Sequence, residues 1–294
     1  MQMQLCSIII PIYKEILSDT ENISLRRCLL ILGKYSICFV TFKQLNTSAY
    51  TKICNLYNIK PSFEYFSKKY FLNGLHGYNQ LLLTNQFYKR FLQFTYILIY
   101  QLDAYVFRDE LEYWCKMDYS FIGSPIFKGN RNCNKYSAYS ECMNGGLSLR
   151  KTKDVYSLLN RNIIIEIFEK KYEKGNIIQK IIAIFQIITI YFRNSYLKEF
   201  WYNEDALFSK YMLERWNNFI IRPKRWSCIF KGNNTQYNLP NFNDTFRFSF
   251  DENIEYLMEL TNNKLPTFCH AFQLDYKRNF WRRYISFNNN TSWL

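Results

Sequence analysis

Three short stretches carry residues that could do chemistry on a phosphorylated substrate. A lone carboxylate, Asp103, follows the apolar run at residues 96–102, which predicts a buried strand. A carboxylate there is well placed to hold Mg²⁺ or Mn²⁺ against a diphosphate. Farther along lie an Asn-Gly-Gly turn at 144–146 and the acidic pair Glu204 and Asp205, which opens a predicted helix. This order suits transfer of a sugar from a nucleotide donor.

Each of these groups also has an ordinary structural explanation. Asp103 could be a solvated turn residue, and Gly145 and Gly146 a common turn. Acidic residues in the first turn of a helix, as Glu204 and Asp205 would be, stabilise the helix dipole. As a catalyst, the pair would instead supply the base that takes the proton of an acceptor hydroxyl as it attacks the anomeric carbon.

The elements that must position these residues alternate between strand and helix. Apolar runs at 5–10, 36–42, 62–66 and 96–102 predict strands, and patterns at 25–32, 49–57 and 78–91 predict helices. This alternation is typical of a parallel α/β sheet. In such sheets ligands bind beyond the carboxyl ends of the strands, which is where Asp103 is expected. Later strands are predicted at 119–122 and 146–149, with an edge element at 271–272.

The composition is that of a folded, basic chain. Its 294 residues fit one large domain or two small ones, and 48% of them are hydrophobic, enough for a substantial core. The net charge of +14 suits phosphorylated substrates, anionic lipid or nucleic acid, yet no zinc-finger or helix-turn-helix pattern is present. The nine cysteines form no CxxC pair, which favours reduced thiols and a cytoplasmic location.

Residues 160–200 interrupt the α/β pattern. They are rich in Ile and Lys and predict two amphipathic helices inserted into the domain. A helical hairpin packed on the domain explains them, and a basic contact with the membrane surface is the alternative. No apolar stretch reaches the roughly 20 residues needed to cross a bilayer, and no signal peptide pattern is visible. We therefore expect a cytoplasmic protein, with peripheral contact at the inner face of the membrane as an open option.

The order of the motifs carries a resemblance. They lie at residues 8–11, 79, 101–103, 121–125, 144–150, 203–205 and 268–272. Residues 101–111 resemble the strand and metal motif of GT-A glycosyltransferases. Most of the chain outside 163–197 resembles a bacterial glycosyltransferase-like family, catalogued as domain of unknown function 5672.

This resemblance implies a fold and a function. The fold would be α/β, a GT-A-like (Rossmann-like) mostly parallel sheet flanked by helices, in a single domain 1–294 with a helical insert at 160–200. The function would be inverting transfer of a sugar from a nucleotide-sugar donor to a glycan or lipid-linked acceptor in surface polysaccharide synthesis. Mn²⁺ or Mg²⁺ is the expected cofactor, and no nucleic acid partner is expected.

The resemblance also assigns roles to single residues. Asp205 would be the base and Glu204 would bind the acceptor, although the two could exchange roles. Asp103 and His270 would hold the metal. The residues expected to bind the donor are Pro11, Tyr13, Asn79, Gln101, Asp103, Gly145 and Gly146.

One departure from the GT-A pattern leaves metal dependence open. The usual Asp-x-Asp reads Gln101-Leu102-Asp103 here, so the first carboxylate is missing. The missing carboxylate favours an alternative, a catalytically impaired GT-A-like protein that still binds nucleotide or glycan, whereas Glu204 and Asp205 argue against it. A basic nucleic-acid or membrane-associated protein is a third possibility, supported only by the net charge. Arg150 could pair with phosphate or lie on a solvated face.

Overall fold

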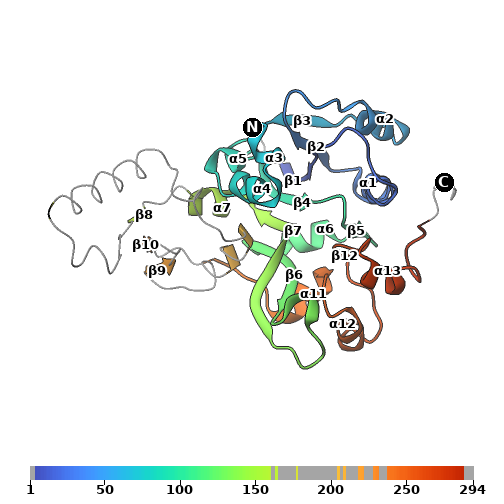
Figure 1. The fold of residues 1–294 in the computed structure, drawn as a ribbon, viewed down its shortest axis with the longest axis vertical. Coiled ribbons are helices and arrows are strands. Elements are labelled where there is room, and N and C mark those ends of the chain that lie inside the picture. Colours follow the sequence, from blue (N-terminus) through green and yellow to red (C-terminus); the bar gives the residue numbers. More distant parts are fainter. Residues whose placement is uncertain are drawn as a thin grey trace.

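The computed structural model describes residues 4–159, 163–164, 177, 204–205, 208–209, 218–221, 228–231 and 237–287 (Figure 1). Nearly all of the predicted helical insert at 160–200 lies outside these residues. The single-domain boundaries at 1–294 stay a prediction. Within the described part of the chain, no helix is both long enough and apolar enough to cross a membrane.

Six strands form the central sheet, in the order β3-β2-β1-β4-β7-β6. They are β1 (Gln4–Pro11), β2 (Ser36–Thr41), β3 (Ser62–Tyr65), β4 (Phe94–Tyr100), β6 (Phe121–Phe127) and β7 (Tyr139–Lys151). The strands β1 to β4 pair in parallel, whereas β7 runs antiparallel to β4 and β6. The predicted fold class, an α/β arrangement with a mostly parallel sheet flanked by helices, is confirmed.

Helices cover both faces of this sheet. On one face lie α1 (Asp19–Leu32), α2 (Ser48–Leu56) and α6 (Leu111–Lys116). On the other lie α3 (Lys69–Leu72), α4 (Gly74–Leu82), α5 (Asn85–Lys89) and α7 (Thr152–Leu159). Side chains alternate along a strand, so Ile8 and Leu98 enter the first core while Ile9 and Ile99 enter the second. Burial on both faces explains why these strands are continuous apolar runs in the sequence.

The C-terminal segment returns to the carboxyl end of β4. It contains α11 (Phe242–Phe248), β11 (Ser249–Phe250), α12 (Ile254–Leu260), β12 (Phe268–Cys269) and α13 (Asp275–Trp281). A small sheet in the order β11-β12-β5 joins it to β5 (Tyr105–Val106), just after β4 (Figure 1). The remaining elements are η1 (Asn130–Asn132) and a sheet of β8 (Ile163–Ile164), β10 (Cys228–Lys231) and β9 (Asn218–Ile221).

Three local predictions are wrong. The helix predicted over 78–91 is two helices, α4 and α5, because Thr84 is extended and caps α5 by accepting a hydrogen bond from the Phe87 amide. The predicted glycine turn at 144–146 lies inside β7, which is continuous on both sides of it. The edge element predicted at 271–272 is not a strand, because the nearest strand, β12, ends at Cys269. Ala271 has a positive φ of 52°, which is outside the range of a strand.

We expect the central strand β4 to dominate stability. Leu98 is fully buried in it, so Leu98→Ala should lower the free energy of unfolding by about 2–5 kcal/mol through lost burial and the cavity left behind. Leu30→Ala on α1 is the matched control, because that leucine is 46% exposed. Urea unfolding followed by circular dichroism measures both variants. Equal losses would mean that the core does not depend on β4 as described.

Candidate active site

The first group of predicted site residues meets where β4 and β12 end. Asp103 lies in the turn between β4 and β5. Because β12 pairs with β5, with Cys269 opposite Tyr105, the next residue, His270, comes beside Asp103. The His270 Nε2 and Asp103 Oδ1 atoms are 3.3 Å apart. The two predicted metal ligands are therefore neighbours, although they are far apart in the sequence.

The His270 imidazole lies between two carboxylates. Its Nδ1 atom is 3.4 Å from Oδ2 of Asp251, on the side away from Asp103. Burial by itself lowers the pKa of His270, but the Asp103 and Asp251 carboxylates outweigh it and raise that pKa to about 10. Burial raises the pKa values of Asp103 and Asp251, yet the His270 cation brings both below their usual range. These pKa shifts favour an imidazolium lying between two ionised carboxylates.

The Asp251 carboxylate also contacts polar side chains other than His270. The buried Lys277 ammonium contacts Asp251 Oδ1 and lies 3.1 Å from Oε1 of Glu252. Asn144 donates its Nδ2 to Asp251 Oδ2 at 2.8 Å, and its Oδ1 accepts the Gly146 amide at 2.7 Å. The cluster of buried charges is therefore tied to the glycine pair of β7.

The glycine pair separates the two groups of predicted site residues. A Cβ on Gly146 would come within 2.5 Å of His270 Nε2 and 2.6 Å of Gln101 Oε1. A Cβ on the neighbouring Gly145 would come within 2.5 Å of Glu204 Oε1. Only glycine leaves room for these side chains to approach the β7 backbone so closely. The metal-side and acid-side residues therefore flank two consecutive positions of one strand.

Arg150 anchors the second group. Its side chain is fully buried, and Nη2 donates to the Gly145 carbonyl and to Glu204 Oε1, both at 3.0 Å. Its Nη1 donates to the Tyr88 hydroxyl at 2.7 Å. The interpretation of Arg150 as a solvated residue is therefore wrong, whereas a phosphate contact stays a prediction. A buried guanidinium is costly unless it is paired, and the Glu204 carboxyl group is its partner.

Glu204 and Asp205 differ in their surroundings. Glu204 is 3% exposed, whereas Asp205 is half-buried and its Oδ2 accepts the Gly145 amide at 3.0 Å. Burial first and the nearby Asp205 carboxylate second raise the pKa of Glu204 to about 7, although Arg150 opposes the shift. The pair therefore presents one tightly enclosed carboxyl group and one more accessible carboxylate.

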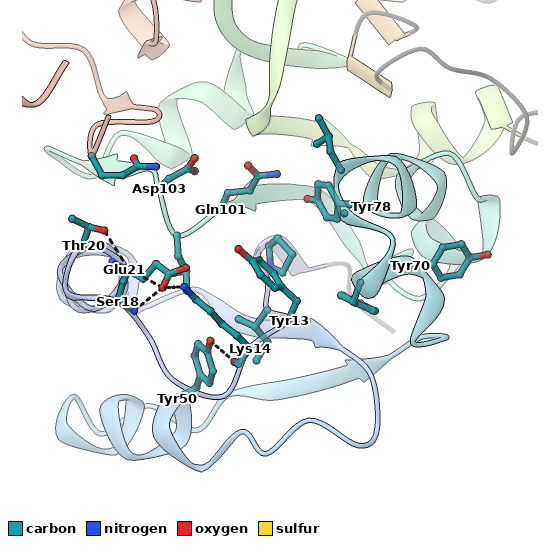
Figure 2. A pocket seen from close by; sticks show the side chains of 17 residues that line it. Tyr13, Lys14, Ser18, Thr20, Glu21, Tyr50, Tyr70, Tyr78, Gln101 and Asp103 are labelled. Atoms are coloured by element: carbon teal, nitrogen blue, oxygen red, sulfur yellow. Dashed lines mark hydrogen bonds and ion pairs between the residues drawn. The ribbon is translucent and has the colours of Figure 1, made fainter. Parts of the chain in front are cut away.

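A cavity of about 460 Å³ opens beside Asp103. Among the predicted donor residues, Pro11, Tyr13, Gln101 and Asp103 line it, and Figure 2 shows Tyr78 facing the same space. Asn79 is buried on α4 and is not part of the lining. The cavity has the size and the mixed aromatic and polar lining of a small-molecule site.

Asp103 and His270 fit a divalent cation. Asp103 Oδ1 and both ring nitrogens of His270 are buried and make no hydrogen bond. The 3.3 Å separation of Asp103 Oδ1 and His270 Nε2 is close to that of adjacent ligands about 2.1 Å from one ion. Gln101 could add its carbonyl oxygen above Gly146. Among the described residues, no three His, Cys, Asp or Glu side chains converge on one point, so substrate phosphate oxygens would have to complete the shell.

Asp251 and Asn144 belong to this site, although sequence reasoning did not assign them roles. Asp251 follows residues 246–250, in which aromatic and polar side chains alternate, a shorter strand signal than the continuous apolar run before Asp103. Lys277 belongs to a basic segment of the sequence at 277–283, but in the structure it is buried. A basic residue among charged neighbours carries no sequence signal of burial, because burial depends on how α13 packs.

The chain belongs to the family described as protein of unknown function (DUF5672), which matches residues 60–270. This match spans the Asp103 turn, the glycine pair, the acidic pair and His270, and it confirms the resemblance to that family. No curated protein matches the chain in sequence.

Solved structures that are similar to this chain include two of one galactosyltransferase. One is the galactosyltransferase LgtC in complex with donor and acceptor sugar analogs, at 13% sequence identity and a TM-score of 0.47. The other is an active-site mutant of LgtC, at 13% identity and a TM-score of 0.45. Each comparison covers 90% of this chain and 86% of the other.

The raised pKa of Glu204 predicts a pH-dependent stability. The folded chain holds this proton more tightly than the unfolded chain, because the pKa rises from 4.5 to about 7 on folding. The contribution is full below pH 4.5 and is lost as the pH rises through about 7. The free energy of unfolding of the wild type, relative to Glu204→Gln, should therefore fall by on the order of 3 kcal/mol between pH 4.5 and pH 8.

Denaturant unfolding at a series of pH values measures this difference. Glu112→Gln is the control, because the Glu112 side chain is 54% exposed and should show no comparable change. A wild-type advantage over Glu204→Gln that stays constant with pH would contradict the prediction.

Proposed function

We propose that this chain transfers a sugar from a nucleotide diphosphate sugar to the hydroxyl of a glycan or lipid-linked acceptor, with inversion at the anomeric carbon. One observation carries the proposal. Asp103 and His270 lie on one side of the Gly145–Gly146 pair, Glu204 and Asp205 lie on the other, and the cavity opens at Asp103. A donor seated there would have its diphosphate near one pair of side chains and its sugar over the glycines.

The cavity supports the donor half of this proposal. Tyr13 is 57% exposed at its rim, so its ring is available to stack on a nucleobase. Lys14 in the same wall is 2.7 Å from Glu21, and Tyr50 donates to the Lys14 carbonyl at 2.8 Å, which orders this wall (Figure 2). Gln101 and Asp103 close the far side, where the diphosphate would lie.

Asp103 and His270 would hold Mn²⁺ or Mg²⁺. When bound, the cation would offset the negative charge that builds on the departing nucleotide diphosphate. His270 could ligate only after Nε2 loses its proton, with Nδ1–H retained toward Asp251. Gln101 contributes a carbonyl oxygen but no charge, so the protein supplies less negative charge than an Asp-x-Asp pair would.

Asp205 is the base in this proposal. As the acceptor oxygen bonds to the anomeric carbon, the bond from that carbon to the diphosphate oxygen breaks, and the hydroxyl proton passes to Asp205. The Gly145 amide holds Asp205 Oδ2 in place at 3.0 Å. Glu204, with a side chain only 4% exposed and paired to Arg150, would support Asp205 rather than meet the acceptor directly.

Gln101 favours a second candidate, a nucleotide- or glycan-binding protein without turnover. It faces the space above Gly146 where a further carboxylate would strengthen a metal site. The two candidates differ in a simple assay. An enzyme releases nucleotide diphosphate from a nucleotide sugar in the presence of Mn²⁺ and an acceptor, whereas a binding protein retains the donor intact.

Asp103→Ala should damage donor binding. Loss of the carboxylate removes the charged protein ligand of the proposed cation, and we expect metal-dependent nucleotide affinity to fall at least about tenfold. Isothermal titration with a panel of nucleoside diphosphates and Mn²⁺ measures this loss. Asp109→Ala is the control, because Asp109 pairs with Lys34 at 2.8 Å outside the cavity. Unchanged affinity in Asp103→Ala would remove Asp103 from the donor site.

Asp205→Asn should instead damage turnover. A general base typically contributes about 10²–10⁴-fold in rate, so kcat should fall by that order while donor affinity stays near the wild-type value. Steady-state release of nucleotide diphosphate gives the rate, with Asp109→Asn as the control. A wild-type rate in Asp205→Asn would make Asp205 a helix-capping residue. A product that retains the anomeric configuration by NMR would refute the single displacement.

A further inference from the structure

We propose that Asp251 and Lys277 are positioning residues, which hold the His270 imidazole so that its Nε2 atom is presented to a cation beside Asp103. This inference rests on the proposed function. It assigns roles to two buried charged side chains that the proposed transfer does not itself use.

Strand register places Asp251 and His270 side by side. β11 and β12 pair in parallel, with Ser249 opposite Phe268 and Phe250 opposite Cys269. Asp251 and His270 are the next residues after these paired strands, and the His270 amide donates to the Phe250 carbonyl at 2.9 Å. The carboxylate and the imidazole are therefore brought together by backbone pairing.

The Asp251 carboxylate is restrained through both of its oxygens. Oδ1 contacts the Lys277 ammonium, whose side chain is 1% exposed. Oδ2 accepts from Asn144 Nδ2 at 2.8 Å and lies 3.4 Å from His270 Nδ1. Lys277 and Asn144 leave the Asp251 carboxylate little freedom to rotate. It therefore stays beside the Nδ1 atom of the His270 ring.

The position of Asp251 determines which nitrogen is available. A histidine that binds a metal through one nitrogen carries a proton on the other, and a hydrogen-bond acceptor at that second nitrogen selects the tautomer. A carboxylate faces each nitrogen, with Asp251 Oδ2 3.4 Å from Nδ1 and Asp103 Oδ1 3.3 Å from Nε2. Asp251 is already held by Lys277 and Asn144, whereas Asp103 Oδ1 makes no hydrogen bond, so the Nε2 side is the one left for the cation. Lys277 offsets the negative charge of Asp251. Without Lys277, this buried carboxylate would be repelled by Asp103 and Glu252 and attracted by His270 alone among the described cations that pair with it.

Mn²⁺ binding without any donor tests the proposal. The dissociation constant is obtained from the electron paramagnetic resonance signal of free Mn²⁺, for the wild type and for the His270→Gln, Asp251→Asn and Glu252→Gln variants. Loss of a carboxylate behind a metal-binding histidine typically weakens affinity about 10–100-fold, which is the change expected for Asp251→Asn. Glu252→Gln is the matched control, since Glu252 shares Lys277 but is not paired with His270. It should bind Mn²⁺ as the wild type does.

Two further readouts separate positioning from a purely structural role. In the transfer assay, Asp251→Asn should need more Mn²⁺ for half-maximal rate but approach the wild-type kcat when Mn²⁺ is saturating. Lys277→Gln should shift the Mn²⁺ requirement in the same direction. Asp251→Glu, which keeps the carboxylate, should recover part of the affinity and serves as the test if Asp251→Asn does not fold by circular dichroism.

The outcomes distinguish this inference from the proposed function. If His270→Gln weakens Mn²⁺ binding but Asp251→Asn does not, the positioning role is wrong and the metal site stands. If Asp251→Asn lowers kcat at saturating Mn²⁺ with an unchanged dissociation constant, the positioning role is also wrong. If neither His270→Gln nor Asp103→Ala alters Mn²⁺ binding, the metal site of the proposed function fails, and the inference fails with it.

Discussion

Backbone pairing between β5 and β12 is the interaction on which the candidate site depends. The pair joins only two residues on each strand, yet it brings the C-terminal segment to the carboxyl end of β4. Arg108 supports the same junction by donating to the carbonyls of Leu265 and Pro266 at 2.7 and 3.0 Å. Without this pairing His270 and Asp251 would have no reason to lie near Asp103, and each buried charge would lose its partner.

The metal-side and acid-side clusters both bury charged groups, and they offset the cost of that burial in different ways. On the metal side, carboxylates and cations alternate from Asp103 through His270 and Asp251 to Lys277, so attraction offsets much of the cost of burial. On the acid side of the described chain, Arg150 pairs with Glu204. Burial and the nearby Asp205 carboxylate together outweigh this pairing and raise the pKa of Glu204. The first arrangement suits binding of a cation, and the second suits exchange of a proton.

The β7 backbone connects these clusters. The Gly146 amide donates to Asn144 and the Gly145 amide donates to Asp205, so main-chain groups hold one side chain from each cluster. The Gly145 carbonyl also accepts from Arg150 and from the Ser148 hydroxyl. A change at either glycine would therefore disturb both clusters, because neither position has space for a Cβ.

The sequence by itself determined the local parts of this protein. Apolar runs predicted β1 to β4, because a strand that is buried on both faces consists of consecutive apolar residues. The position of Asp103 directly after one of these runs indicated a site. The sequence did not show the helix break at Thr84, where the side-chain cap of α5 outweighs the continuous helical pattern. It also did not show that the glycine pair lies inside β7, where strand pairing outweighs the turn preference of glycine. Only the tertiary structure decided that Arg150 and Lys277 are buried cations and that Asp251 stands behind His270. Those contacts join segments that are distant in the chain, and long-range strand pairing leaves no periodic signal in the sequence of either segment.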